Sequence, residues 1–283
     1  MKKFTAEQKK KYYAEQKESA EKALIEGVKY CYTEGNFKKY LDVVSRFHDY
    51  SINNCMLIAW QNPDATYVAG FSAWRDKFKR NVRKGEKAIK ILAPVPKKII
   101  VKDVNPDGTE TEREVRFTRF RSVNVFDISQ TDGEDLPSIC NRLDGKVDDY
   151  DDVINKLIAL AKPNVRFDDL KGKANGYYSR VTDEIVLQSG MSQKMTIKTL
   201  VHEIAHSILH SDAFIEIPRS IKEMQAESVA YMVCKQIGID TDEYTFEYVA
   251  SWASGDTKKL SEQMDICRKT SDMIVGKLIP TVA

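Results

Sequence analysis

Cysteine is scarce in this sequence, and its placement excludes two common uses of the residue. The 283 residues include five cysteines, which is an odd number, and no two of them form a Cys-x-x-Cys pair. They are scattered along the chain at Cys31, Cys55, Cys140, Cys234 and Cys267. A disulfide framework or a cysteine-based zinc knuckle needs paired or closely spaced cysteines. We therefore expect reduced thiols, as is typical of proteins of the cytosol.

Long apolar runs are absent as well. No stretch approaches the roughly 18–20 apolar residues that a membrane-spanning helix needs. The first residues, MKKFTAEQKKKYYAEQKESAEK, have no apolar core of the kind that a secretory signal requires. We expect a cytoplasmic protein with no membrane partner.

The net charge of +2 hides an asymmetry between the two parts of the chain. Residues 1–130 hold 26 basic and 17 acidic residues, whereas residues 131–283 hold 18 basic and 25 acidic residues. A basic N-terminal part is typical of a surface that faces a polyanion. Solvated lysine-rich helices explain the same charge without a partner.

The hydrophobic pattern predicts an N-terminal part that contains a sheet and a C-terminal part that is mainly helical. Helices are expected at 5–32 and 36–60, followed between about 64 and 128 by short strands rich in β-branched and aromatic residues. NPDG at 105–108 is typical of a turn between two of these strands. Further along, the pattern predicts a helix at 151–162, a strand at 164–167, a strand–turn–strand unit in GYYSRVTDEIVLQ, and helices at 192–211, 219–237, 243–253 and 258–278.

These elements indicate the α+β class and two domains, 1–138 and 139–283. We expect the first domain to combine helices with a small curled or barrel-like sheet, and the second to be mostly helical with a small sheet. The boundary falls inside an acidic, turn-rich stretch at about 135–150.

The segment TLVHEIAHSILH, residues 199–210, holds three of the four histidines of the chain. On a helix, His202 and His206 lie four apart on one face, so both can bind a single metal ion. Glu203 sits one step round the helix, where it can take a proton from a water at that ion. The strand-like DEIVLQ just before this helix offers a sheet edge for a substrate. The alternative is a helix with two hydrogen-bonded histidines and a surface glutamate.

A third ligand has to come from another segment. His210 lies eight residues after His202, about 12 Å along a helix axis, which is too far for one ion. The next predicted helix offers Glu223 and Glu227, again four apart. One of them can bind the metal while the other orients a ligand histidine. Glu223 also ends a capping-box pattern that begins at Ser220, and if it caps its own helix, then Glu227 becomes the ligand.

The second functional signal is a basic segment with interleaved aromatic residues. Between 75 and 90 there are eight basic residues against Asp76 and Glu86 alone, and Trp60, Tyr67, Phe71, Trp74 and Phe78 lie nearby. Cations for phosphates and rings for bases are what single-stranded nucleic acid binding needs. The alternative is that the aromatic residues form a core and the lysines an ordinary solvated face, and for Trp60, Phe71 and Trp74 individually a core position is favoured.

Several of these segments together resemble a known family. WQNPDATYVAGFSAW, RNVRKGEKAIKILAP and VFDISQTDG are similar to the N-terminal single-stranded-DNA-binding domain of ArdC-type antirestriction proteins and their LtrC-like relatives. Those proteins join this domain to a C-terminal zincin-like metallopeptidase domain, and the resemblance covers roughly residues 20–270. The HExxH helix with its following glutamates also resembles thermolysin-like zincins and ImmA/IrrE-type peptidases.

The resemblance implies roles for particular residues. It favours Glu223 over Glu227 as the third zinc ligand beside His202 and His206, with Glu203 as the catalytic base. It also implies a set of DNA contacts, namely Arg80, Arg83, Lys84 and Lys87, with Gly85 forming a tight turn near a phosphate. Lys79 and Trp74, which belong to the same basic and aromatic segment, complete the set of candidate DNA contacts.

Two functions follow as hypotheses. The first is a protein of a mobile genetic element that binds single-stranded DNA and is a Zn²⁺-dependent peptidase acting on an unknown protein substrate. The resemblance implies a role in antirestriction. The second is a DNA-shielding protein whose zincin-like domain is structural or vestigial. The intact Glu203 favours the first, because a purely structural metal site needs no base.

Overall fold

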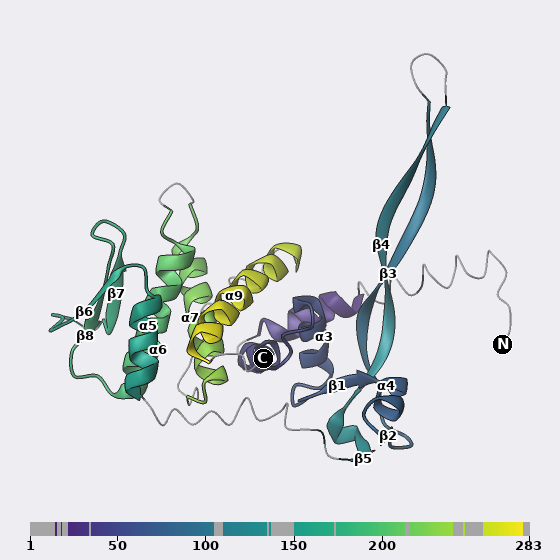
Figure 1. Ribbon diagram of the computed structural model, residues 1–283, viewed down its shortest axis with the longest axis horizontal. Helices are drawn as coiled ribbons and strands as arrows, with labels where there is room; N and C mark the ends of the chain where they lie inside the picture. The colour runs from purple at the N-terminus through teal and green to yellow at the C-terminus, as the bar shows by residue number, and fades with distance from the viewer. Residues whose placement is uncertain are drawn as a thin grey trace. The chain divides into compact units, whose positions relative to one another are not determined.

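The computed structural model describes residues 22–33, 35–104, 110–134, 150–172, 174–212, 216–239 and 257–279, together with positions 15, 18, 136 and 246 (Figure 1). Its helices and small sheets confirm the α+β class. The expected helix at 243–253, the NPDG turn, most of the proposed boundary stretch and the first part of the expected helix at 5–32 lie outside these residues. Residues 22–31 of that last segment are helical.

The chain forms two compact units that divide it differently from the two predicted domains. One unit comprises residues 1–27 and 65–134, and the other comprises 28–64 and 135–283. Residues 28–64 precede the basic segment in sequence but belong to the unit that carries the HExxH helix. Their apolar side chains explain this grouping, because Tyr40, Leu41 and Ile58 are fully buried.

The N-terminal unit contains two small antiparallel sheets. In the first, β1 (Val68–Gly70), β4 (Glu110–Asp127) and β3 (Ile89–Val104) are arranged in the order β1-β4-β3. In the second, β2 (Arg80–Val82) pairs with β5 (Thr131–Gly133). Both sheets are open in the described residues, so the barrel-like alternative is wrong. Short strands were expected between about 64 and 128, but β3 is one continuous strand of 16 residues, which pairs with β4 along its whole length.

A short helix supplies the core of this unit. Trp74, on α4 (Phe71–Asp76), is fully buried, and its ring lies against Tyr67 and Phe78 with centroids 5.6 and 5.2 Å away. Its indole Nε1 donates a hydrogen bond to the Phe126 carbonyl at 2.9 Å. A buried indole needs such a partner, so Trp74 ties the helix to β4.

The C-terminal unit begins with two helices where the sequence predicted one at 36–60. They are α2 (Asn36–Arg46) and α3 (Ile52–Gln61). Between them, Ser51 adopts an extended conformation and its side chain accepts a hydrogen bond from the Asn54 backbone N–H at 3.3 Å. Serine is a preferred N-cap residue, which explains why a new helix starts at this point.

Next in the chain come α5 (Tyr150–Leu160) and a three-stranded sheet. Its strands are β6 (Asn164–Asp168), β7 (Gly176–Ser179) and β8 (Glu184–Gln188), in the order β6-β8-β7. The segment DEIVLQ was expected to supply a sheet edge, but it forms the central strand β8. Its Ile185, Val186 and Leu187 are fully buried, as the centre of a sheet requires. The edge beside the metal-motif helix is β7 instead.

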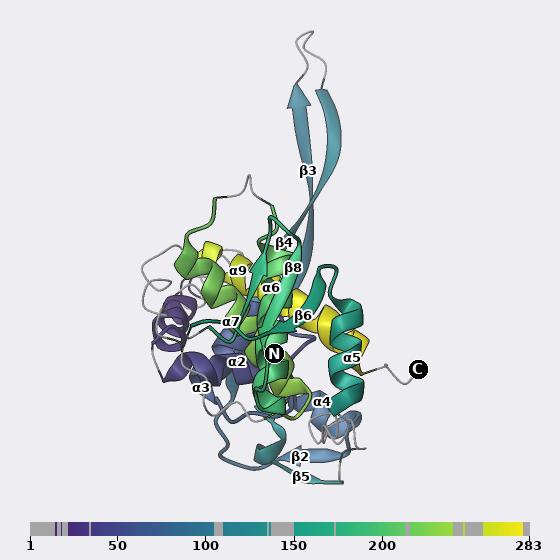
Figure 2. The same ribbon diagram turned by 90° about the vertical axis from the view of Figure 1, so that its left-hand side faces the viewer.

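Three long helices complete the unit: α6 (Gln193–Leu209), α7 (Arg219–Gln236) and α9 (Thr257–Leu278). Figure 2 shows the β6–β8 sheet beside α6. Fully buried side chains from α6 and α7, such as Leu200, Ile204 and Val229, form the core. Cys31, Cys55, Cys234 and Cys267 are buried in this unit. Among the residues that the structure describes, no helix is both long and apolar enough to cross a membrane.

Candidate functional site

The helix α6 has one apolar face, which packs into the core, and one polar face, which carries His202 and His206. Its N-cap Ser192 accepts a hydrogen bond from the Met195 backbone N–H. Leu200, Val201 and Ile204 anchor the helix in the core and fix its rotation. As a result, His202 and His206 lie side by side with their imidazoles partly buried, 19% and 15% exposed.

Three ligand atoms converge in front of this polar face. The Nε2 atoms of His202 and His206 lie 3.1 Å apart. Oε2 of Glu223, on α7, lies 3.5 Å from the first and 3.6 Å from the second. Three ligands held 2.0–2.1 Å from a tetrahedral zinc ion are about 3.4 Å from one another. The triad therefore fits a small divalent ion, and its two imidazoles and one carboxylate are donors that such ions accept.

The two glutamates of α7 occupy different places. Glu223 faces the Nε2 atoms, whereas Glu227 lies behind His202, with Oε2 3.0 Å from Nδ1. Glu227 is also paired with Lys198 at 3.3 Å. The geometry thus gives Glu223 the position of a ligand and Glu227 that of a residue that orients His202. Their roles toward a metal remain predictions.

The capping-box alternative for Glu223 is wrong. The helix α7 begins at Arg219, with Pro218 as its N-cap and no side-chain cap. Glu223 is therefore a full turn inside the helix rather than at the third helical position that a capping box needs.

Behind the second histidine lies a chain of neutral groups. His206 Nδ1 is 2.9 Å from His210 Nδ1, and His210 Nε2 is 2.9 Å from Gln225 Oε1. The Gln225 amide in turn donates to Gln263 on α9. Burial lowers the pKa of His210 to about 4, so this imidazole is uncharged at neutral pH. As the sequence predicted, His210 is not in the group of three ligands.

Charge concentrates on the other side of the triad. Burial by itself lowers the pKa of His202, but hydrogen bonds to Glu223 and Glu227 outweigh it and raise the pKa to about 9. The hydrogen bonds from His202 and His206 hold the pKa of Glu223 well below its usual range. The raised pKa favours the protonated form of His202, so a metal ion would bind there in competition with a proton and would release it on binding.

Glu203 is buried beside the triad. It is 7% exposed, and burial raises its carboxyl pKa, an effect that the nearby histidines oppose. Together with His202 it lines a cleft of about 270 Å³. A buried carboxylate in a cleft next to a ligand set is placed to accept a proton.

The edge strand β7 forms another wall of this cleft through Gly176. A Cβ at this position would lie 2.8 Å from the Thr199 side chain and 3.0 Å from that of Leu187. Glycine therefore allows the edge strand to approach α6 closely. The sequence analysis did not select Gly176, and only its place at the start of the first strand of GYYSRVTDEIVLQ would have suggested it.

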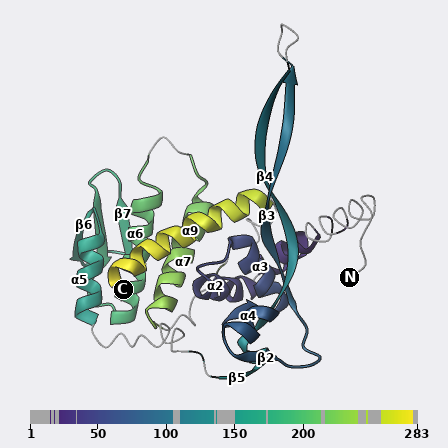
Figure 3. The same cartoon turned by 45° about the vertical axis from the view of Figure 1, so that its right-hand side comes forward.

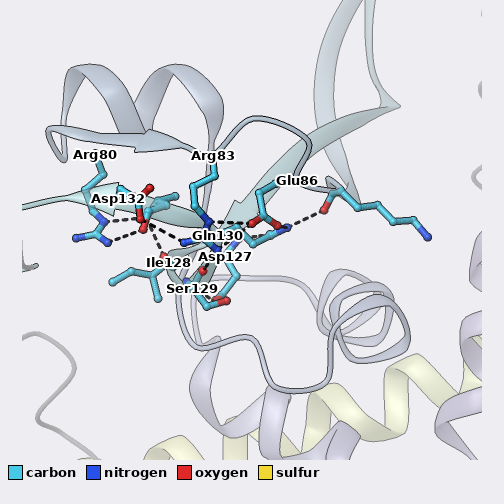
Figure 4. A network of polar contacts seen from close by, with 10 residues as sticks. Arg80, Arg83, Glu86, Asp127, Ile128, Ser129, Gln130 and Asp132 are labelled. Atoms are coloured by element: carbon cyan, nitrogen blue, oxygen red, sulfur yellow. Dashed lines mark hydrogen bonds and ion pairs between the residues drawn. The ribbon is translucent and has the colours of Figure 1, made fainter.

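In the N-terminal unit, the predicted DNA-contact residues have different surroundings. Arg80 is buried, and its guanidinium donates to the Thr131 hydroxyl at 2.7 Å and to the carbonyls of Thr131 and Gly133 at 2.9 and 3.1 Å (Figure 4). It also donates to the Glu134 carbonyl. The guanidinium thus fastens β2 to β5, so the prediction that Arg80 contacts DNA is wrong.

Arg83 belongs to the same network, but unlike Arg80 its side chain is exposed to solvent (Figure 4). It pairs with Glu86 at 2.8 Å and with Asp132 at 3.3 Å, and it is 42% exposed. The Gln130 side chain links Glu86 to the Lys87 carbonyl. This arrangement holds the loop between β2 and β3 in one shape and leaves Arg83 partly neutralised.

The other candidates differ in exposure. Trp74 is a core residue, so the prediction that it contacts DNA is also wrong. Lys79, Lys84 and Lys87 are exposed, as phosphate contacts need to be. Gly85 has a φ of +92°, so the tight turn expected there is present.

A comparison with known families separates the two parts of the chain. Residues 10–126 match the family model of the N-terminal domain of anti-restriction factor ArdC. The chain carries an ArdC-type N-terminal domain. The arginine network of Figure 4 reaches just beyond the matched residues, through β5.

Solved ArdC structures share the fold of this chain. The metal-free antirestriction ArdC protein from R388 plasmid is 20% identical, with a TM-score of 0.53 over 81% of this chain and 85% of its own. The Mn(II)-bound structure of that protein is 18% identical, with the same TM-score over 82% and 86% of the two chains.

A curated relative is longer. An uncharacterized protein of Bacillus anthracis, pXO2-81, is 28% identical over 289 residues, which cover 89% of this chain and 49% of that protein. The ArdC-type chain therefore spans about half the length of this relative.

Proposed function

We propose that this ArdC-type protein is an antirestriction protein that binds single-stranded DNA and hydrolyses peptide bonds at a metal centre formed by His202, His206 and Glu223. The observation that carries the enzymatic part is the triangle of ligand atoms, with sides of 3.1, 3.5 and 3.6 Å. The buried Glu203 beside it supports an enzyme rather than a structural site, because a structural ion is closed off and needs no base.

An ion held by this triad would act as a Lewis acid on a water and on the substrate carbonyl. Glu203 would accept a proton at a carboxylate oxygen and pass it to the leaving amine. Glu227 keeps His202 in the tautomer whose Nε2 faces the ligand position, since its Oε2 lies next to Nδ1. An extended peptide can align with the free side of β7, whose other side pairs with β8.

We propose zinc as the ion. Two imidazoles and one carboxylate form a ligand set used by catalytic zinc sites, with one position left for water. The related R388 protein has a Mn(II)-bound structure, so manganese is the alternative that a measurement has to separate.

The DNA-binding part rests on the ArdC-type domain and on the exposed lysines around Gly85. Lys79, Lys84 and Lys87 form the phosphate-binding surface, without Arg80 and Trp74. The solved relative from R388 plasmid is an antirestriction protein, and this supports the same role here.

Metal analysis of the purified protein, without added metal, tests the centre. We expect about one zinc per chain. His202→Ala should lose the zinc, whereas His48→Ala should keep it. His48 is not part of the triad, and its Nδ1 lies 2.9 Å from Asp272 Oδ1. Absence of any divalent metal in the unsubstituted protein would reject the proposal.

A second candidate is a DNA-shielding protein that performs no proteolysis. The family match favours it in one respect, since it covers residues 10–126 and not the metal triad. A DNA-protection assay with Glu203→Ala separates the two functions. Full protection by this variant favours shielding alone, and lost protection with unchanged DNA affinity favours the peptidase.

A further inference from the structure

The strands β3 and β4 continue together far beyond the rest of their sheet (Figures 1 and 3). β1 pairs with residues 125–127 of β4 only. From the pair Leu92–Ser122 to the pair Val104–Glu110, the two strands form a ribbon, which we call the arm.

The arm is not part of a hydrophobic core. None of its described side chains between 92 and 122 is buried, and Ile100 and Phe120 are 69% and 63% exposed. A two-stranded ribbon gains little stability from its own contacts. A ribbon of this length therefore calls for an explanation other than packing.

The basal half of the arm is strongly basic. Residues 92–100 and 115–122 contain five basic residues and no aspartate or glutamate. All five are exposed, and they are Lys97, Lys98, Arg116, Arg119 and Arg121. The first acidic residue toward the tip is Glu114, which pairs with Arg116 at 2.7 Å and with Lys98 at 3.2 Å.

The pairing register distributes these cations over both faces of the ribbon. Arg119 is opposite Val95 and Arg121 is opposite Ala93, so both share a face with Lys97. Lys98 is opposite Arg116 on the other face, which also carries Phe120 opposite Pro94. The sequence analysis overlooked this surface, although three arginines at 116, 119 and 121 signalled it.

We propose that the arm binds duplex DNA by entering the major groove. This groove is about 12 Å wide and admits a two-stranded ribbon. Phosphate backbones flank the groove on both sides, so cations on both faces of the ribbon can be neutralised at once. The exposed Phe120 can contact the methyl groups of thymines from within the groove.

The same features fit a single strand poorly. Single-strand binding relies on several rings that stack successive bases along one surface. The described part of the arm has one highly exposed ring, at Phe120, and a strand on one face would leave the cations of the other face without a phosphate contact. The arm is thus a second DNA-binding surface, distinct from the lysines around Gly85 that we assign to single strands.

Fluorescence anisotropy with a short duplex and with a single strand of the same sequence, over a range of salt concentrations, tests this inference. The arm variant is Lys97→Ala/Arg119→Ala/Arg121→Ala, and the loop variant is Lys84→Ala/Lys87→Ala. As a control of equal charge change, Lys162→Ala/Lys171→Ala/Lys277→Ala removes three exposed lysines of the other unit.

The arm variant should bind the duplex at least about 10-fold more weakly than the unsubstituted protein. In a plot of log K against log[salt], the magnitude of its slope should fall by about 2.7, which is 0.9 for each lost phosphate contact. Its single-strand affinity should stay within about twofold, as should both affinities of the control. The loop variant should show the opposite selectivity.

Unchanged duplex affinity and salt slope in the arm variant would overturn the inference, and so would equal losses for duplex and single strand. The conservative variant Arg119→Lys/Arg121→Lys keeps the charge and should retain duplex binding. Failure of the loop variant alone would reject the proposed single-strand surface and leave the arm intact.

Discussion

Nδ1 of His206 lies 2.9 Å from Nδ1 of His210, so one of the two nitrogens has to carry the proton between them. If His206 offers its Nε2 lone pair to a metal, then its proton is on Nδ1 and His210 is the acceptor. His210 then carries its own proton on Nε2, which donates to Gln225 Oε1. The chain of bonds thus fixes the tautomers of both imidazoles.

His210→Ala should weaken zinc binding by about 10- to 100-fold without lowering the number of sites per chain, because His206 loses the partner that orients it. Competition with a chromophoric chelator measures the affinity. His48→Ala is the matched control and should bind as the unsubstituted protein does. Complete loss of the site in His210→Ala would instead make His210 a ligand.

Glu203→Gln should keep the metal and abolish peptide hydrolysis. The amide has nearly the shape of the carboxylate but cannot accept the proton. Metal content and cleavage of an unstructured protein substrate, measured on one preparation, check both halves of the prediction. Glu216→Gln, at an exposed position, is the control. Retained cleavage by Glu203→Gln would remove Glu203 from the mechanism.

Two glycines should respond to alanine in opposite directions. Gly176→Ala should cost about 1–3 kcal/mol of unfolding free energy, because its Cβ would lie 2.8 Å from the Thr199 side chain and 3.0 Å from the Val186 carbonyl. Gly276 lies in α9, and a Cβ at this position would have no atom of another residue within 4 Å. Gly276→Ala should therefore raise the free energy of unfolding by up to about 1 kcal/mol. Urea unfolding of both variants measures the difference. A stable Gly176→Ala variant would show that β7 and α6 can move apart.

Substitution of Arg80 should lower stability, whereas substitution of the neighbouring lysines should lower the affinity for DNA. Arg80→Ala should cost about 1–3 kcal/mol of unfolding free energy, since the buried Thr131 carbonyl and the partly buried Gly133 carbonyl of β5 lose their donor. The free energy of unfolding of Lys84→Ala/Lys87→Ala should stay within about 0.5 kcal/mol of that of the unsubstituted protein, although this variant binds single strands more weakly. Thermal unfolding and anisotropy are the two measurements. An Arg80→Ala protein of full stability would return this arginine to the binding surface.

Local periodicity carried much of the prediction from sequence. Spacing by four on a helix placed the imidazoles of His202 and His206 together, and the length of the helix correctly separated His210 from the ligand group. The class of the fold followed from the same alternation of apolar and polar residues. Each of these depends on neighbours within a few residues, which a sequence displays directly.

What the sequence did not reveal depends on distant partners. Charge and aromaticity suggested Arg80 and Trp74 for DNA, but their polar atoms bond to the carbonyls of Thr131 and Phe126, about 50 residues further along the chain. Likewise, β8 was expected at a sheet edge, because strand order is not visible in one strand. Which of Glu223 and Glu227 faces the Nε2 atoms of the histidines depends on how α7 packs against α6, and this packing is not visible in the spacing of the residues.

The pairing of β1 with the end of β4 has a consequence for how the gene product can be divided. The Tyr67 carbonyl accepts a hydrogen bond from the Ile128 backbone N–H at 2.9 Å, and Thr66 N–H donates to Asp127 at 2.8 Å. Residues 66 and 67 therefore lie beside residues 127 and 128, within the unit that comprises 1–27 and 65–134. A cut near residue 138 would strip α2 and α3 from the unit that carries the metal triad. A division that follows the compact units keeps residues 28–64 with the unit that carries the metal triad, and in synthesis that unit is complete only after residues 65–134 have been translated.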